Sequence, residues 1–302
     1  MSTPQSAILP DHCKAGIFIE ADVVPTQEAH LKKAAPEALD ALAKLQTQYP
    51  EAALGLTIAF GSDLWKSFGH SGEGSEIKPF RPLGNGLAPA TQHDVMFHIQ
   101  SLRPDVNFSL AMSLLEIFGD SIKVADETHG FRWIEERGLE GFIDGTENPQ
   151  GDEEITRVGT IATEEPGGGG SYVLLQKYRH DLKKWNTFDL NLQEDCVGRS
   201  KAENEEFEGE KLNPRAHIAR TNLKENGVGL KIVRRSLPYG TASGEHGLMF
   251  IAYCGRLYNI EAQLLSMFGE TDGKTDLLLE HVTTAVSGAY YYAPSVERMR
   301  NL

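Results

Sequence analysis

The sequence predicts an α+β fold in which two similar units follow one another, each an antiparallel sheet with helices packed on it. Three observations predict this. The chain has 302 residues, which suits two ordinary domains or one large one. Segments with the two-residue period of strands alternate with segments that have the 3–4-residue period of helices. A strand–helix pattern in the first half also recurs in the second half.

The first half contains the elements of one such unit. Strands are predicted over Lys14–Val23, Ala53–Phe60 and Asp94–Leu102, helices over Gln27–Gln48 and Pro104–Phe118, and further extended pieces over Ile122–Ala125 and Gly130–Ile134. Pro36 predicts either a kink in the first helix or a break into two shorter ones. Gly119 is the expected end of the second helix. The order strand-helix-strand-strand-helix-strand is that of a ferredoxin-like unit.

The second half repeats this pattern. MFHIQSLRPDVNFSLAMSLLEIFGD (Met96–Asp120) and MFIAYCGRLYNIEAQLLSMFGE (Met249–Glu270) both run from Met-Phe on a strand, through a polar turn, into a leucine-rich helix that closes on Phe-Gly-acid. The other predicted elements are strands over Ser171–Arg179, Val228–Leu237 and Gly247–Cys254 and helices over Leu182–Glu194 and Ile260–Phe268. We therefore predict ferredoxin-like domains over residues 1–150 and 171–302, joined by a glycine-rich loop over 151–170.

Charge and residue usage exclude several classes of function. The net charge of −14 argues against a nucleic-acid partner and against docking on anionic membranes. No stretch approaches the ~18 apolar residues of a transmembrane helix, and no signal peptide is visible. Three widely spaced cysteines predict neither a disulfide framework nor a zinc site, and the ten histidines lack zinc-hydrolase spacing. We expect a cytoplasmic protein.

The word GFIDGTENP, from Gly141 to Pro149, places Asp144 between an apolar pair and a glycine. One interpretation is a turn and nothing more, because Asp-Gly is among the commonest turn pairs. The other is a turn that aims the Asp144 carboxylate at a substrate or cofactor. The local pattern alone does not decide between them.

Two further motifs could contribute functional side chains to the same site. His217 lies in LNPRAHIARTN, and Arg234 follows 17 residues later in KIVRRSLPYG. On a strand, Arg234 would share a face with Ile232 and Ser236, which could put a cation and a hydroxyl into a cleft. The alternative is that Arg234 forms an ordinary surface ion pair.

Taken together, the three words resemble the signature of the dye-decolorising peroxidases, in particular their bacterial class B/P branch. The resemblance rests on Gly141–Gly145 as a G-x-x-D-G motif, on His217 and Arg234 in the same order and spacing, and on the word R-x-S-L-P-Y-G. It extends from the Lys14 strand to Tyr290–Tyr292. It implies tandem ferredoxin-like domains in a dimeric α/β-barrel-like superfold, with haem b bound non-covalently by the C-terminal domain.

The resemblance also implies roles on the two faces of the haem. His217 would be the ligand of the haem iron, with its second ring nitrogen held by a carboxylate. Asp276 matches the position of that carboxylate, and Glu280, one helical turn on, is the competing candidate. Asp144 and Arg234 would be the catalytic residues on the opposite, distal face.

Further cofactor-binding positions follow on the distal face. Arg234 would stabilise charge on the peroxide and also contact a haem propionate. Ser236 occupies a position where many relatives carry asparagine, which leaves its contribution open. Phe250 would line the distal pocket, and Leu248 would share its face.

The implied reaction is reduction of hydrogen peroxide with oxidation of bulky organic donors such as dyes or porphyrins. Asp144 would move a proton between the two peroxide oxygens, and because aspartate stays ionised in mild acid we expect an acidic optimum for dye oxidation. Relatives form homodimers or larger homo-oligomers, and the same is expected here. The final residues, PSVERMRNL, show no encapsulin-targeting tail.

Two other functions stay open at this point. A haem- or porphyrin-binding or haem-processing protein on the same fold would use His217 but would not need Asp144 and Arg234 together. A ferredoxin-like oligomer without haem would have a regulatory or structural role.

Overall fold

The computed structural model describes residues 2–10, 13–70 and 72–302. Its first half is one antiparallel sheet with two long helices on it. The elements are β1 (Ala15–Val23), α1 (Glu28–Gln48), β2 (Gly55–Phe60), α2 (Ser62–Ser67), β3 (Val95–Ser101), α3 (Pro104–Phe118) and β4 (Ile122–Phe131). The strands lie in the order β2-β3-β1-β4. This is the predicted ferredoxin-like arrangement, in which the first and third strands are central.

Side-chain alternation along β1 explains how the helices bind this sheet. Ile17 and Ile19 point outward into the apolar core that α1 and α3 cover, whereas Phe18 points to the opposite face. The predicted disruption at Pro36 does not divide the helix: α1 is a single helix with Pro36 inside it. Buried alanines and leucines occur on both sides of Pro36, so packing on the sheet holds the two parts together.

The second half builds the same sheet with shorter pieces. Its elements are β5 (Ser171–His180), α5 (Leu182–Trp185), α6 (Leu190–Val197), α7 (His217–Thr221), β6 (Lys224–Glu225), β7 (Val228–Gly229), β8 (Val233–Arg234), β9 (Leu237–Gly240), β10 (His246–Cys254), α8 (Leu257–Met267), α9 (Leu277–His281), β11 (Thr283–Ala285), β12 (Ala289–Ala293) and α10 (Val296–Met299). β5 pairs with β10 on one side and with β11 and β12 on the other, and β10 also pairs with β8 and β9. The strand order of the first half is thus repeated.

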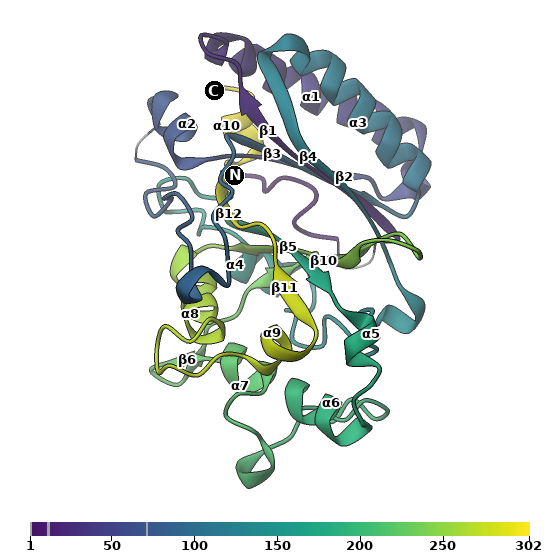
Figure 1. The fold of residues 1–302 in the computed structure, drawn as a ribbon. Helices are drawn as coiled ribbons and strands as arrows, with labels where there is room; N and C mark the ends of the chain where they lie inside the picture. Colours follow the sequence, from purple (N-terminus) through teal and green to yellow (C-terminus); the bar gives the residue numbers. More distant parts are fainter. Residues whose placement is uncertain (1, 11–12, 71) are drawn as a thin grey trace.

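The two sheets join edge to edge and close on themselves. β4 pairs with β9 through Gly130 and Tyr239, and β12 pairs with β2 through Tyr292 and Phe60. With the β5–β10 pairing, the strands form a ring, which is the expected barrel-like superfold. Its interior is filled by side chains from both halves, such as Phe18. Figure 1 shows the two sheets with helices on their outer sides.

Helices cover the outer faces of the two sheets differently. In the first half α1 and α3 lie side by side directly on the sheet (Figure 1). In the second half α8 packs on β5 and β10, α7 packs on α8, and α9 packs on β11. Residues of α7, α8 and α9 face residues of β5, β8 and β10 across a cavity. This cavity is where the predicted site residues meet.

Several segments differ from the sequence-based expectation. The extended pieces predicted over Ile122–Ala125 and Gly130–Ile134 belong to one strand, β4, which ends at Phe131. The predicted loop over 151–170 contains a two-turn helix, α4 (Asp152–Gly159). The predicted helix Leu182–Glu194 is two helices, α5 and α6, because Asp181 and Asp189 each accept a hydrogen bond from a backbone N–H and start a new helix. The predicted strand Val228–Leu237 is broken into β7, β8 and the start of β9.

Neither a membrane-spanning helix nor a disulfide occurs in the part of the chain that the structure describes. No helix among these residues is long and apolar enough to cross a membrane. Cys13, Cys196 and Cys254 are buried as separate thiols.

Glu20 is a buried carboxyl inside the barrel, where it accepts a hydrogen bond of 2.5 Å from the Tyr291 hydroxyl. Burial raises the pKa of Glu20 from 4.5 to about 7. A pKa that is higher in the folded than in the unfolded chain means that folding favours the protonated form. The resulting stabilisation is complete below about pH 4.5 and is lost as the pH rises through 7.

We therefore expect Glu20→Gln, which mimics the protonated form, to become more stable than the wild type as the pH rises. Between about pH 4 and about pH 9 the difference in free energy of unfolding should change by about 3 kcal/mol in favour of the variant. Urea denaturation across this range measures it. Exposed Glu37→Gln on α1 is the control and should give no such slope; an equal slope for both variants would contradict the assignment to Glu20.

Candidate functional site

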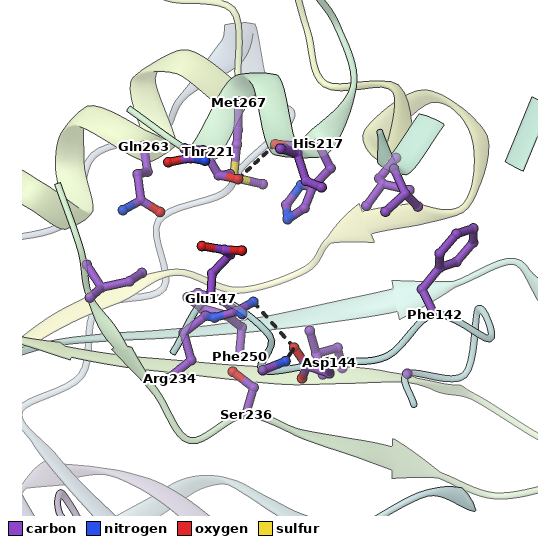
Figure 2. A pocket seen from close by; sticks show the side chains of 18 of the residues that line it. Phe142, Asp144, Glu147, His217, Thr221, Arg234, Ser236, Phe250, Gln263 and Met267 are labelled. Carbon is purple, nitrogen blue, oxygen red and sulfur yellow. Dashed lines mark hydrogen bonds and ion pairs between the residues drawn. The ribbon is translucent and has the colours of Figure 1, made fainter. Parts of the chain in front are cut away.

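His217 is the first residue of α7, and its imidazole points into the cavity (Figure 2). Its Nδ1 lies 2.6 Å from Oδ2 of Asp276, which is fully buried. Because a carboxylate oxygen accepts hydrogen bonds, Nδ1 carries the ring proton and donates a hydrogen bond to Oδ2 of Asp276. The second ring nitrogen, Nε2, is then the basic atom available to the cavity.

Asp276 is held in place by its position at the start of α9. Its second oxygen, Oδ1, accepts a hydrogen bond of 2.8 Å from the backbone N–H of Leu278, which caps the helix. The N–H of Leu277 donates to the carbonyl of Arg215, just before His217. The segment that carries the carboxylate is therefore fixed to the segment that carries the imidazole.

Glu280, the competing candidate, lies elsewhere. Its Oε2 is 2.5 Å from Nη2 of Arg215, and this guanidinium holds the pKa of Glu280 below its usual range. Arg215 also donates to the carbonyl of Thr275, one residue before Asp276. Glu280 thus binds the arginine that secures this turn, and the carboxylate beside His217 is that of Asp276.

The word GFIDGTENP forms a loop on the opposite side of the cavity. The N–H of Asp144 donates to the carbonyl of Glu136, and the N–H of Gly145 donates to Oδ1 of Asp144 at 2.7 Å. Gly145 has a φ of 84°, in the left-handed region that glycine adopts without strain. The turn predicted from the Asp-Gly pair therefore exists, and it presents the Asp144 carboxylate to the cavity.

Arg234 lies next to Asp144. Its Nη1 is 3.3 Å from Oδ1 of Asp144, and about a quarter of each side chain is exposed. Ile232, Arg234 and Ser236 all line the cavity, whereas Val233 between them packs inside the barrel. This is the predicted alternation. Figure 2 shows Asp144 and Arg234 across the cavity from His217.

Ser236 and Phe250 complete this side of the cavity. The Ser236 hydroxyl is buried and accepts a hydrogen bond from the N–H of Ile251, so it is occupied in fixing the strands. Phe250 lies on the wall with its ring edge-to-face with that of Tyr178. Leu248 also lines the cavity, as its predicted shared face requires.

Most of the exposed wall of the cavity is apolar, and polar and charged side chains lie among the apolar ones. Among the apolar lining residues are Leu174, Ile218, Ile232, Leu248, Phe250, Ile260, Leu264, Met267, Leu279 and Val282. The polar groups include the imidazole of His217 on one side and the Asp144–Arg234 pair on the other. An apolar cleft with a few oriented polar groups is typical of a cofactor or small-molecule site.

Glu147 and Arg199, which line the cavity, and Asn148, which anchors the loop, are among the residues that the sequence did not predict as part of the site. Arg199 is mostly buried and lies 3.2 Å from Glu147 and 3.4 Å from Glu206. Asn148, in GFIDGTENP, binds the backbone of Arg234. The sequence signal available for Asn148 and Glu147 was their membership of that motif. For Arg199 no local pattern gives a signal, because Glu147, its partner in the loop, lies 52 residues away.

Comparison with known proteins identifies the family. Residues 5–132 match the family model described as Dyp-type peroxidase, N-terminal, and residues 135–298 match the one described as Dyp-type peroxidase, C-terminal. The chain belongs to the Dyp-type peroxidase family. The resemblance drawn from the three words is therefore confirmed.

Relatives and solved structures agree with this membership. The dye-decolorizing peroxidase of Mycobacterium tuberculosis is 34% identical, over 98% of this chain and 89% of the relative. The structure of a dye-decolorizing protein from Vibrio cholerae is 39% identical, with a TM-score of 0.92 over 98% of this chain and 99% of that one. A variant of DypB from Rhodococcus jostii RHA1, solved in complex with heme, is 30% identical, with a TM-score of 0.93 over 100% of both chains.

Family membership settles the class of function. The chain is a peroxidase of a haem-dependent family that acts on hydrogen peroxide and organic donors, as predicted. The predicted α+β fold of ferredoxin-like units is confirmed by the same structures. No group of three or more His, Cys, Asp or Glu side chains that could hold a metal ion occurs among residues 2–10, 13–70 and 72–302.

Proposed function

We propose that peroxide is reduced in the cavity between His217 and the Asp144–Arg234 pair. The observation that supports this most strongly is that pair, 3.3 Å apart, on the far side of an apolar cavity from an imidazole with one free nitrogen. A haem- or porphyrin-binding protein would use the imidazole and the apolar walls. It would have no need of a carboxylate beside the guanidinium on the opposite side, so Asp144 next to Arg234 favours the peroxidase.

The residues present fit a haem. His217 Nε2 would be the iron ligand, and the carboxylate of Asp276 would fix the ring and make it a stronger donor. The apolar walls, Phe250 among them, suit the porphyrin faces. Arg234 supplies positive charge for a propionate. The haem b is held non-covalently, since the sequence has no C-x-x-C-H attachment motif.

The haem supplies the redox chemistry when bound, and the distal residues handle the protons. The Asp144 carboxylate accepts a proton from one oxygen of hydrogen peroxide and returns it to the other, which then leaves as water. The Arg234 guanidinium, 3.3 Å from the carboxylate, orients it and stabilises negative charge as the O–O bond breaks. Both groups are in place before peroxide arrives, so they need little reorganisation.

The location, assembly and domain division are part of the same proposal. Three buried thiols suit a reducing cytoplasm.

A homodimer or larger homo-oligomer is supported by apolar side chains on the outer face of α3, where Phe108 is 50% and Met112 61% exposed. The division into residues 1–150, 151–170 and 171–302 is supported by the repeated strand order, with α4 inside the connecting segment. The donors are bulky dyes or porphyrins.

Asp144→Asn tests the proposed proton transfer. We expect the rate constant for reaction with peroxide to fall by roughly 10²–10⁴-fold, because the amide cannot accept the proton. The absorption spectrum of the bound haem should stay close to that of the wild type. Stopped-flow mixing with peroxide measures the rate. Asp152→Asn, on exposed α4, is the control; a loss of less than about tenfold in Asp144→Asn would contradict the role of Asp144.

Asp276→Asn tests the support of the iron ligand. Asparagine still caps α9, but it is a neutral partner for the imidazole, so haem affinity should fall by roughly 10–100-fold. Transfer of haem to an excess of apomyoglobin measures this affinity. Glu280→Gln removes the other candidate carboxylate and should leave the affinity nearly unchanged. The reverse ranking of the two variants would assign the supporting role to Glu280.

A further inference from the structure

The side chain of Asn148 binds both backbone groups of Arg234. Oδ1 accepts a hydrogen bond of 2.8 Å from the N–H of Arg234, and Nδ2 donates one of 3.0 Å to its carbonyl. The two residues are 86 positions apart. Two residues of neighbouring antiparallel strands exchange the same pair of bonds. The Asn148 amide therefore takes the place that a further strand would occupy beside Arg234.

The backbone of Arg234 is open to such a partner because of where β8 lies. This strand has two residues and pairs with β10, with Arg234 opposite Ala252, and it is the last strand in the sheet order. The adjacent N–H of Arg235 donates to Ile251 of β10. The N–H and carbonyl of Arg234 point the other way, toward the loop. Without Asn148 this edge would lose two hydrogen bonds.

The other end of this connection is Asp144. The N–H of Asn148 donates to the carbonyl of Gly145, and the N–H of Gly145 donates to Oδ1 of Asp144. The loop between Asp144 and Asn148 is thus one tight turn. At its start the Asp144 carboxylate meets the Arg234 guanidinium, and at its end the Asn148 amide holds the Arg234 backbone. The loop contacts the same arginine twice.

We propose that Asn148 is a positioning residue that sets the distance between Asp144 and Arg234. The inference rests on the proposed function of this pair and adds the element that holds it together. A long arginine side chain has several rotatable bonds, so an ion pair at its tip does not by itself fix where the carboxylate lies. Fixing the backbone of Arg234 to the carboxylate's own turn removes that freedom.

The remaining contacts of the loop lead to a different part of the molecule. Glu147 pairs with Arg199, and the hydroxyl of Thr146 accepts a hydrogen bond of 3.1 Å from the amide of Asn204. Both partners belong to the segment after α6. If Asn148 is removed, these contacts still attach the loop to that segment. The expected consequence is a loop that stays folded but is displaced relative to Arg234.

The experiment uses the haem-bound protein and a double-mutant cycle with Asn148→Ala and Arg234→Ala. Displacing reacting groups by about 1 Å can cost about 100-fold in rate, so Asn148→Ala should lower the rate constant for peroxide by about that factor. The KM for a dye donor and the haem absorption spectrum should not change. In the Arg234→Ala background the same substitution should cost clearly less than in the wild type, because the distance between Asp144 and the guanidinium no longer contributes to the rate.

Asn204→Ala is the matched control, because it removes the other asparagine amide that binds this loop. It should retain most of the rate. A rate for Asn148→Ala within about threefold of the wild type would overturn the proposal, as would an equal loss in the Arg234→Ala background or in Asn204→Ala. Should Asn148→Ala not fold, Asn148→Asp keeps the bond to the Arg234 N–H, and an intermediate loss is expected.

Hydrogen exchange of the Arg234 amide gives a readout independent of activity. In the haem-bound wild type this N–H should be protected, and in Asn148→Ala it should exchange at least about tenfold faster, since its acceptor is gone. Unchanged exchange would refute the contact. Faster exchange with an unchanged peroxide rate would refute the positioning role. If the wild type itself did not react with peroxide, the proposed function would fail, while the exchange result would still test the contact.

Discussion

The closure of the strand ring constrains everything else in this protein. Because the strands of both halves form a closed barrel, one face of each strand packs in the interior. A site for substrates or cofactors can form only on the outer face. In the first half α1 and α3 pack directly on the outer face and cover it. In the second half short helices leave a cavity instead. Val233 and Arg234 show the consequence, since adjacent residues serve the interior and the site.

The two sides of the cavity differ in the surroundings of their aspartates, Asp276 and Asp144. Asp276 has no exposed surface, and its two oxygens bind the His217 imidazole and the N-terminus of α9, so it would support His217 as the proposed iron ligand. Asp144 retains some exposure and faces Arg234, so its charge is available to a substrate. The environment, and not the residue type, gives these two aspartates different tasks. A carrier of haem would need the first arrangement without the second.

Much of this was predictable from the sequence, and the exceptions have physical causes. Long periodic segments such as Pro104–Phe118 were predicted to the residue, because one face of a helix that packs on a sheet must be apolar. The helix Leu182–Glu194 was wrong because Asp189 caps a new helix inside an apparently continuous pattern. Asp144, His217 and Arg234 stood out because they lie in recognisable words. The roles of Arg199 and Asn148 depend on partners 52 and 86 residues away, which no local pattern encodes.

The central claim is that one imidazole holds the haem iron, and the absorption spectrum of haem-reconstituted His217→Ala tests it most directly. The account predicts that the band positions of the wild type are lost, because His180, which also lines the cavity, bonds through Nδ1 to the Thr283 hydroxyl and not to a buried carboxylate as His217 does. His246→Ala is the control: the ring of His246 bonds to the carbonyl of Gly244 at the surface, and its removal should keep the wild-type spectrum. A wild-type spectrum in His217→Ala would contradict the account.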